Sequence, residues 1–196
     1  MISILINFPP VFMSGGLFLP IRQKGNNMEP FNSRRITRIG VIAALYFLLT
    51  VSLSSLSYGP VQFRVAEMLM LLCFFNKDFI FSVSIGCFIA NLFSSMSLDI
   101  LFGTSATVIS GILIYVFRKD GSTSRLLLCS LFPVAANAFI VGAELHYLEG
   151  VPFWLLAGEV ALGEFVCITV LGVVVFGRLQ KREGFMKLIR DKQEEA

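Results

Sequence analysis

The chain has 196 residues, of which 56% are hydrophobic and 15% are charged, and its formal net charge is +3. Soluble domains carry about 25% charged residues, and the mean hydropathy of +0.79 excludes an ordinary soluble domain. The composition therefore predicts an integral membrane protein whose apolar segments span the bilayer.

The first 27 residues differ from the rest of the chain. The stretch "MISILINFPPVFMSGGLFLP" is interrupted by Pro9 and Pro10, and it has neither a basic leader nor a small-residue cleavage site, so it does not fit a signal peptide. We expect translation to start at Met28. The predicted organisation is an extension at residues 1–27, a membrane domain at 28–182 and a charged cytoplasmic tail at 183–196.

Six apolar segments follow in chain order, and a spanning helix needs about 20 mostly apolar residues. They are residues 36–55, 65–75, 79–95, 98–117, 126–147 and 152–179. The second is too short to span unless the preceding "YGPVQF" lies within the membrane boundary. Because the links are short, we expect one compact all-α membrane protein, a bundle of six transmembrane helices.

The distribution of Lys and Arg predicts the orientation of this bundle. With a cytoplasmic amino terminus, the opposite side receives only Arg64. The cytoplasmic side receives Arg34, Arg35, Arg38, Lys77, Arg118, Lys119, Arg125, Arg178, Lys181, Arg182, Lys187, Arg190 and Lys192. Acidic residues lie among the basic residues of the tail, which indicates a solvated helix end and no nucleic-acid surface. We expect a multi-pass protein of the cell membrane with both termini in the cytoplasm.

Polar residues in the six segments are candidates for a binding site. A charge near the centre of a spanning helix costs at least ~2.5 kcal/mol on insertion scales and tends to mark a ligand or ion pathway. In this topology the polar residues fall mostly in the outer half of the membrane, which predicts a cavity open to the outside. They are Arg64, Glu67, Asn91, Asp99, Asn137, Glu144 and Glu159, with Glu164 nearer the midplane.

Helical spacing relates some of these candidates to one another. Asn137 and Glu144 are seven residues apart and therefore lie on one stripe. Glu159 and Glu164 are five residues apart, about 140° around a helix, so they cannot both point straight into one pocket. The spacing leaves open which of them faces the ligand.

Each candidate also has a structural alternative. Asp99, which follows Ser97, fits a helix N-cap, and the single histidine, His146, fits an interfacial position. Asn91 and Asn137 are suited to hydrogen bonds between helices. Arg64 and Glu67 suit a structural pair that fixes the preceding loop.

Catalytic and metal-binding patterns are missing from the sequence. No nucleophile–base arrangement, Gly-rich phosphate loop or "HExxH" motif occurs. The four cysteines, Cys73, Cys87, Cys129 and Cys167, stand singly in apolar stretches and are expected to be buried free thiols. We therefore expect no metal, no cofactor and no enzymatic activity.

Five stretches together resemble one family. They are "YGPVQFRVAEMLMLLCFF" (58–75), "GCFIANLFS" (86–94), "DILFGTSATVISGILIYVFR" (99–118), "PVAANAFIVGAEL" (133–145) and "ALGEFVCITVLG" (161–172). This pattern is similar to the QueT family, the queuosine-precursor S components of energy-coupling factor (ECF) transporters. The resemblance runs from about residue 34 to 179, covers all six segments and leaves residues 1–27 outside.

The resemblance implies a six-helix bundle of ECF S-component type. Such a protein binds its substrate at the outer face and docks on a transmembrane coupling subunit that carries two ATPases. The loop after the first helix, here "LSYGPVQFR", typically caps the substrate. Docking uses small residues of the first helix, which predicts Gly40, Ala43 and Ala44 as the docking face; ordinary packing within the bundle is the alternative.

The implied substrate is a 7-deazaguanine with a cyano or aminomethyl group, which is rich in N–H donors. Carboxylates accept such donors and neutralise the aminomethyl cation. We expect the base to contact Glu67, Asn137, Glu144 and Glu159, and further candidates are Arg64, Asn91, Tyr58 and Glu164. The alternatives are an S component for another heterocyclic vitamin or nucleobase, a membrane-embedded enzyme, and a structural partner without a ligand.

Overall fold

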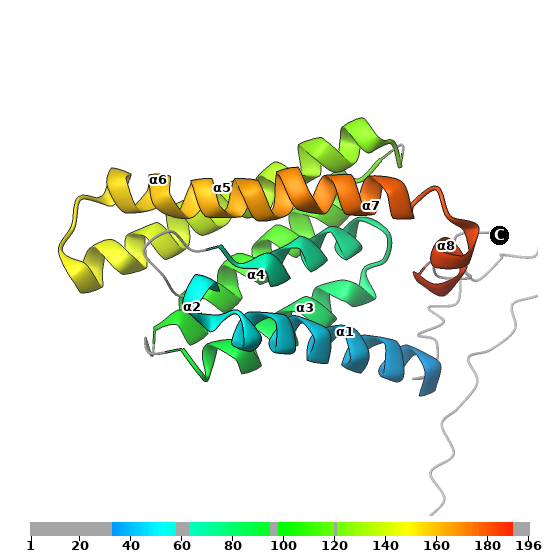
Figure 1. Cartoon of the computed structure of the whole chain (residues 1–196), viewed down its shortest axis with the longest axis horizontal. Helices are drawn as coiled ribbons and strands as arrows, with labels where there is room; N and C mark the ends of the chain where they lie inside the picture. The colour runs from blue at the N-terminus through cyan, green and yellow to red at the C-terminus, as the bar shows by residue number, and fades with distance from the viewer. Residues whose placement is uncertain (1–32, 58–62, 95–97, 120, 190–196) are drawn as a thin grey trace, which may run out of the picture. The chain divides into compact units, whose positions relative to one another are not determined.

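The computed structural model describes residues 33–57, 63–94, 98–119 and 121–189, which belong to one compact unit, Phe31–Ala196. Regular secondary structure in this part of the chain is entirely helical (Figure 1). The elements are α1 (Ser33–Ser52), α2 (Ser54–Ser57), η1 (Val65–Phe74), α3 (Asp78–Asn91), α4 (Asp99–Phe117), α5 (Thr123–Glu149), α6 (Phe153–Glu164), η2 (Phe165–Gly172), α7 (Val173–Leu179) and α8 (Glu183–Ile189). The predictions for residues 1–27, Tyr58 and the tip of the capping loop lie outside the described residues.

Four helices are long and apolar enough to cross a membrane: α1, α4, α5 and the continuous helix Phe153–Leu179 formed by α6, η2 and α7. The second and third predicted segments correspond to shorter apolar helices, η1 and α3. With 14 residues, α3 extends about 21 Å, which is less than the ~30 Å hydrocarbon core. The predicted all-α fold is confirmed, and four helices among the described residues have the length and composition of membrane spans.

The short helix η1 forms the centre of the bundle. It is a 3₁₀ helix of ten residues, eight of which are buried. It packs against α1, α3, α4, α5 and the π-helical segment η2. An apolar helix surrounded on nearly all sides has no polar face, which explains why its sequence lacks an amphipathic pattern. The four cysteines lie buried and free, as predicted.

Glycines allow close helix crossings on both sides of this centre. A Cβ atom at Gly86 of α3 would lie 2.8 Å from the carbonyl oxygen of Ala43 and 2.8 Å from Cβ of Tyr46, both on α1. A Cβ atom at Gly142 of α5 would lie 3.0 Å from Cα of Ala157 on α6. Small residues at such crossings let helix backbones approach closely.

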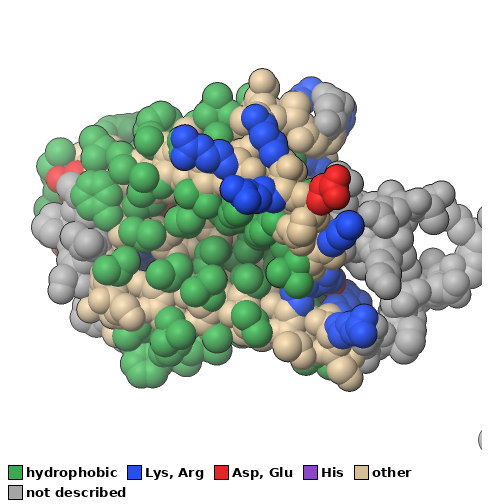
Figure 2. Space-filling model, turned by 45° about the vertical axis from the view of Figure 1, so that its right-hand side comes forward, with side chains coloured by type: hydrophobic (Ala, Val, Ile, Leu, Met, Phe, Trp, Pro, Cys, Tyr) green, Lys and Arg blue, Asp and Glu red, His purple; other side chains and the backbone are tan. Residues whose placement is uncertain are grey.

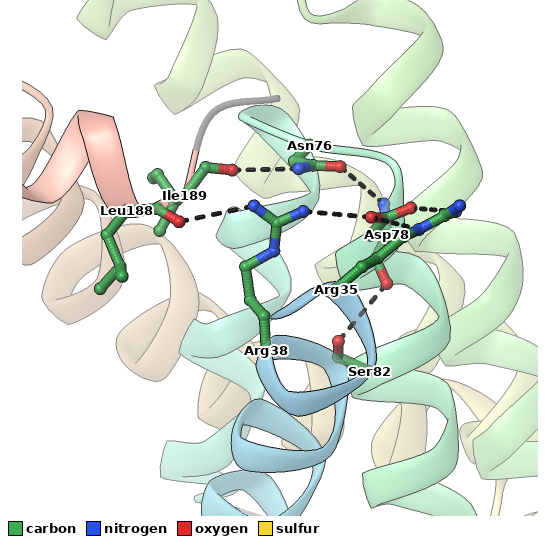
Figure 3. Close-up of polar contacts among 7 residues, drawn as sticks. All are labelled: Arg35, Arg38, Asn76, Asp78, Ser82, Leu188 and Ile189. Atoms are coloured by element: carbon green, nitrogen blue, oxygen red, sulfur yellow. Dashed lines mark hydrogen bonds and ion pairs between the residues drawn. The ribbon is translucent and has the colours of Figure 1, made fainter. Parts of the chain in front are cut away.

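Basic side chains gather at one end of the bundle, while apolar side chains cover much of the face that Figure 2 shows. At this end Arg35 and Arg38 of α1 pair with the buried Asp78 at the start of α3, at 2.5 and 3.1 Å (Figure 3). Arg38 also donates to the carbonyl oxygen of Leu188, and Asn76 donates to that of Ile189. These bonds attach α8 to the end of the bundle where α1 begins (Figure 1).

Candidate binding site

A group of buried polar residues occupies the part of the bundle away from this basic end. We call it the acidic cluster, and each residue in it is at most 2% exposed. Its members come from six segments of the chain: Arg64 just before η1, Glu67 in η1, Asn91 at the end of α3, Asp99 at the start of α4, Asn137 and Glu144 on α5, and Glu164 at the end of α6.

Arg64 lies among the carboxyl groups of this cluster. Its guanidinium is 3.6 Å from a carboxylate oxygen of Asp99, and its Nε donates to the carbonyl oxygen of Ser57 at 3.5 Å. It is also within electrostatic range of the other three acids, Glu67, Glu144 and Glu164. The cluster thus places four acidic side chains around one arginine, which leaves an excess of carboxyl groups.

Glu67 and Glu164 have the same bonding pattern. Oε1 of Glu67 accepts a hydrogen bond from the hydroxyl of Tyr46 on α1. Oε1 of Glu164 accepts one from the amide of Asn137 at 3.1 Å. In both residues Oε2 is buried and has no hydrogen-bond partner among the described residues. Each carboxyl group is therefore oriented by one neutral donor and has one acceptor oxygen available.

Asp99, Glu144 and Asn91 provide further acceptors. The carboxyl group of Glu144 faces that of Asp99, and neither oxygen of Glu144 has a hydrogen-bond partner within the described part of the chain. Oδ2 of Asp99 accepts from Ser94 at 2.5 Å, while its Oδ1 lacks a described partner. The amide of Asn91 donates to the Asp99 carbonyl at 2.8 Å, and its oxygen is likewise available.

These oxygens define the chemistry of the cluster. Burying a polar group without a hydrogen bond is costly, and here the cost is concentrated on acceptors that converge from α3, α4, α5, α6 and η1. A guest that brings several N–H donors, or a positive charge, would satisfy them. An anionic guest would add a further negative charge to four acids.

The structure brings six of the eight predicted ligand residues together: Arg64, Glu67, Asn91, Asn137, Glu144 and Glu164. Asn137 and Glu144, which share one stripe of α5, are both buried. Of the two glutamates on the last span, Glu164 belongs to the cluster. Glu159 is half-buried and faces a different side of the helix, and no described interaction links it to the cluster. Tyr58 lies outside the described residues.

Two residues of the site were absent from the predicted base contacts. Asp99 was a candidate for the site, with a helix N-cap as its structural alternative. The N-cap interpretation is wrong: the N-cap position of α4 is Leu98, without a side-chain cap bond, and Asp99 pairs with Arg64. Tyr46 was read as part of an apolar span. A phenol in the middle of the first span was the available signal, because a buried Tyr hydroxyl usually has a hydrogen-bond partner.

The three predicted docking residues do not share one face of α1. Gly40 and Ala44 are exposed, and a Cβ atom at Gly40 would meet nothing within 4 Å. Ala43 is buried, with its carbonyl oxygen against Gly86 of α3. Ala43 therefore belongs to the packing between α1 and α3, and the open face contains Gly40 and Ala44.

The fold and the acidic cluster define a multi-pass membrane protein with a buried polar site. The sequence profile of the QueT transporter family matches residues 36–181, and the chain therefore belongs to this family, whose members are transporters and not enzymes. A relative from Lactococcus lactis subsp. cremoris (strain MG1363), the queuosine precursor transporter QueT, is 36% identical over 165 residues, which are 79% of this chain and 97% of the relative. No solved structure matches the chain.

Proposed function

We propose that this protein is the S component of an ECF transporter and binds a queuosine precursor of the 7-deazaguanine type for uptake. The name of the Lactococcus relative supports the substrate. The observation that carries the proposal is the pair of half-satisfied carboxyl groups, Glu67 and Glu164, each oriented through one oxygen with the other available.

The chemistry of a 7-deazaguanine complements this arrangement. Its guanine-like edge presents N–H donors, which Glu67 and Glu164 can accept through their Oε2 atoms. The guanidinium of Arg64 can donate to the ring carbonyl. Glu144, which faces a second carboxyl group, is suited to the ammonium of the aminomethyl form. Asn137 acts by orienting Glu164, and the amide oxygen of Asn91 is a further acceptor.

The topology fits uptake from outside. We propose that η1 and α3 complete a six-segment bundle and that both termini lie in the cytoplasm. The basic end with Arg35 and Arg38 then faces inward, and the acidic cluster lies toward the outer side. The sequence carries no nucleotide-binding motif, so a coupling subunit with two ATPases would supply the energy and dock on the α1 face with Gly40 and Ala44.

Binding measurements on the purified protein test this proposal. We expect tight binding of the aminomethyl or cyano precursor. Glu164→Gln keeps the shape of the side chain and replaces one carboxyl oxygen with an NH₂ group. It should weaken binding about 10- to 100-fold, because leaving a buried donor or acceptor unsatisfied costs about 1–3 kcal/mol. Glu159→Gln is the matched control on the same helix and should change the affinity less than about 2-fold.

Three results would contradict the proposal. If the wild-type protein binds neither precursor, the proposed substrate is wrong. Tighter binding of another heterocyclic vitamin or a nucleobase in competition would assign the same site to that ligand. A loss of binding in Glu159→Gln with none in Glu164→Gln would place the site elsewhere.

A further inference from the structure

Tyr46 connects α1 to the acidic cluster. Its side chain is 1% exposed, and its hydroxyl donates to Oε1 of Glu67 in η1. The other members of the cluster come from η1, α3, α4, α5 and α6, or from just before η1. This hydrogen bond is thus a direct polar link between the first span and a carboxyl group to which we assign substrate contact.

The position of the Tyr46 hydroxyl depends on how closely α1 packs on α3. Gly86 lies directly opposite Tyr46, and even a methyl group there would come within 2.8 Å of the Tyr46 Cβ atom. The two helices are therefore in contact at the level of this side chain. Glu67 lies in η1, which packs against both α1 and α3. Because the tyrosine ring is rigid, a movement of α1 away from α3 and η1 carries the hydroxyl away from Glu67.

The opposite face of α1 is open. Among the four helices of spanning length, α1 is the least enclosed by the rest of the protein. Of its most apolar 18-residue stretch, 17% is buried, compared with 33% or 44% for the other three helices. Gly40, Val41, Ala44 and Leu48 are exposed on it. One helix thus contacts the acidic cluster on one side and is available to lipid or to a protein partner on the other.

We propose that Tyr46 is a positioning residue that makes substrate affinity depend on the packing of α1 against α3. With α1 packed, the phenol orients the Glu67 carboxyl group and leaves Oε2 for the ligand. With α1 displaced, Glu67 loses its donor and its orientation, so the ligand is held less tightly. This inference rests on the proposed function, in which the acidic cluster binds the precursor.

A consequence follows from thermodynamic linkage. If packing of α1 strengthens substrate binding, bound substrate stabilises the packed position of α1 by the same factor. A partner that docks on the open face and shifts α1 would lower the affinity and promote release. Through Tyr46, docking of the partner on α1 would then change the orientation of Glu67 and the affinity for the substrate.

A double-mutant cycle on substrate affinity tests the role of Tyr46. Tyr46→Phe keeps the ring and removes the hydroxyl, and we expect the Kd for the precursor to rise about 5- to 20-fold. This is less than for loss of a direct contact with the ligand, because Tyr46 acts only by orienting Glu67. Glu67→Met fills the same volume without an acceptor. In this background Tyr46→Phe should change the Kd less than 2-fold, because the residue through which it acts is absent.

Two further variants separate positioning from general packing. Gly86→Ala should push α1 outward, and it should weaken binding without adding to the effect of Tyr46→Phe. Tyr115→Phe, on the half-buried tyrosine near Arg118 at the basic end, removes the same hydroxyl far from the cluster and should leave the Kd unchanged. Thermal unfolding and gel filtration establish that each variant is folded.

The outcomes distinguish this inference from the proposed function. If the wild type binds the precursor and Glu67→Met weakens binding while Tyr46→Phe does not, the positioning role is overturned and the proposed function stands. If Tyr46→Phe has its full effect in the Glu67→Met background, Tyr46 does not act through Glu67 and the inference is also overturned. If the wild type does not bind the precursor, the proposed function itself fails.

Discussion

Glu67 and Glu164 become directed acceptors because each is bonded through one oxygen to a neutral group. Tyr46 and Asn137 fix the planes of these carboxyl groups without neutralising them. The remaining oxygens are buried and have no partner among the described residues, an arrangement that is costly in an apolar environment. A ligand N–H removes this cost when it binds, so the site favours a donor-rich molecule.

Glu144 is expected to discriminate between the two forms of the precursor. Its carboxyl group lies beside that of Asp99 and has no hydrogen-bond donor among the described residues, so it suits an ammonium group better than a neutral nitrile. Glu144→Gln should weaken binding of the aminomethyl compound about 10-fold or more, since a charge-assisted hydrogen bond is lost. Binding of the cyano compound should change much less. Titration calorimetry with both ligands measures the ratio.

The exposed Glu149, at the end of the same helix, provides the matched control. Glu149→Gln should affect neither ligand. Equal weakening of both compounds by Glu144→Gln would show that Glu144 does not read the charged substituent.

Residue spacing predicted some of this site and not the rest. The stripe of Asn137 and Glu144 could be predicted because it depends on the period of one helix. The pairing of Asp99 with Arg64 could not, since it joins residues 35 positions apart through the fold. A carboxylate at the start of a helix fits a cap equally well from sequence alone, and only the neighbouring segments decide between the two roles.

Glu67 and Glu164 both lie in or next to a helix that departs from α-helical geometry. Glu67 lies in the 3₁₀ helix η1, and Glu164 directly precedes the π-helical segment η2, which packs against η1. A 3₁₀ helix of ten residues is unusual in length, and its burial on nearly all sides stabilises it here. Departures from α-geometry are therefore concentrated beside the site, as is common near functional positions.

Asp78 is expected to stabilise the packing of α1, α3 and α8 at the basic end. It is fully buried and pairs with Arg35 and Arg38, which remain partly exposed. Asp78→Ala should therefore destabilise the protein by about 2–3 kcal/mol, less than the loss of a fully buried pair because solvent screens the arginines. Thermal unfolding in detergent provides the measurement.

Asp78→Ala also tests whether the basic end affects stability without affecting substrate binding. Because Asp78 lies at the start of α3 and the acidic cluster includes its last residue, Asn91, substrate affinity should change less than about 2-fold at temperatures where the variant is folded. Lys181→Ala, an exposed position near α8, is the control and should leave stability unchanged. A stable Asp78→Ala protein with lost binding would contradict this division of roles.

The sequence predicted the elements better than their geometry. Segments 98–117, 126–147 and 152–179 correspond closely to α4, α5 and the helix Phe153–Leu179, because about 20 apolar residues have few other solutions in a membrane. The helix type of η1 could not be predicted, since an apolar run carries no periodicity when it is buried on all sides. The close contact of α1 and α3 through Gly86 likewise depends on tertiary packing.

The whole molecule separates its charges into two functional ends. The basic end joins α1 to α3 through partly exposed ion pairs and attaches α8 through hydrogen bonds to its backbone carbonyls. The acidic cluster is enclosed by the bundle and carries more carboxyl groups than arginines. This separation suits a carrier that is held in one orientation by its basic loops and receives a donor-rich substrate from the other side.

A structure of the protein with aminomethyl-7-deazaguanine bound tests this account most directly. We predict N–H groups of the ligand within hydrogen-bond distance of Oε2 of both Glu67 and Glu164, with the ammonium beside Glu144. A ligand bound elsewhere, with these oxygens paired to protein groups, would contradict it.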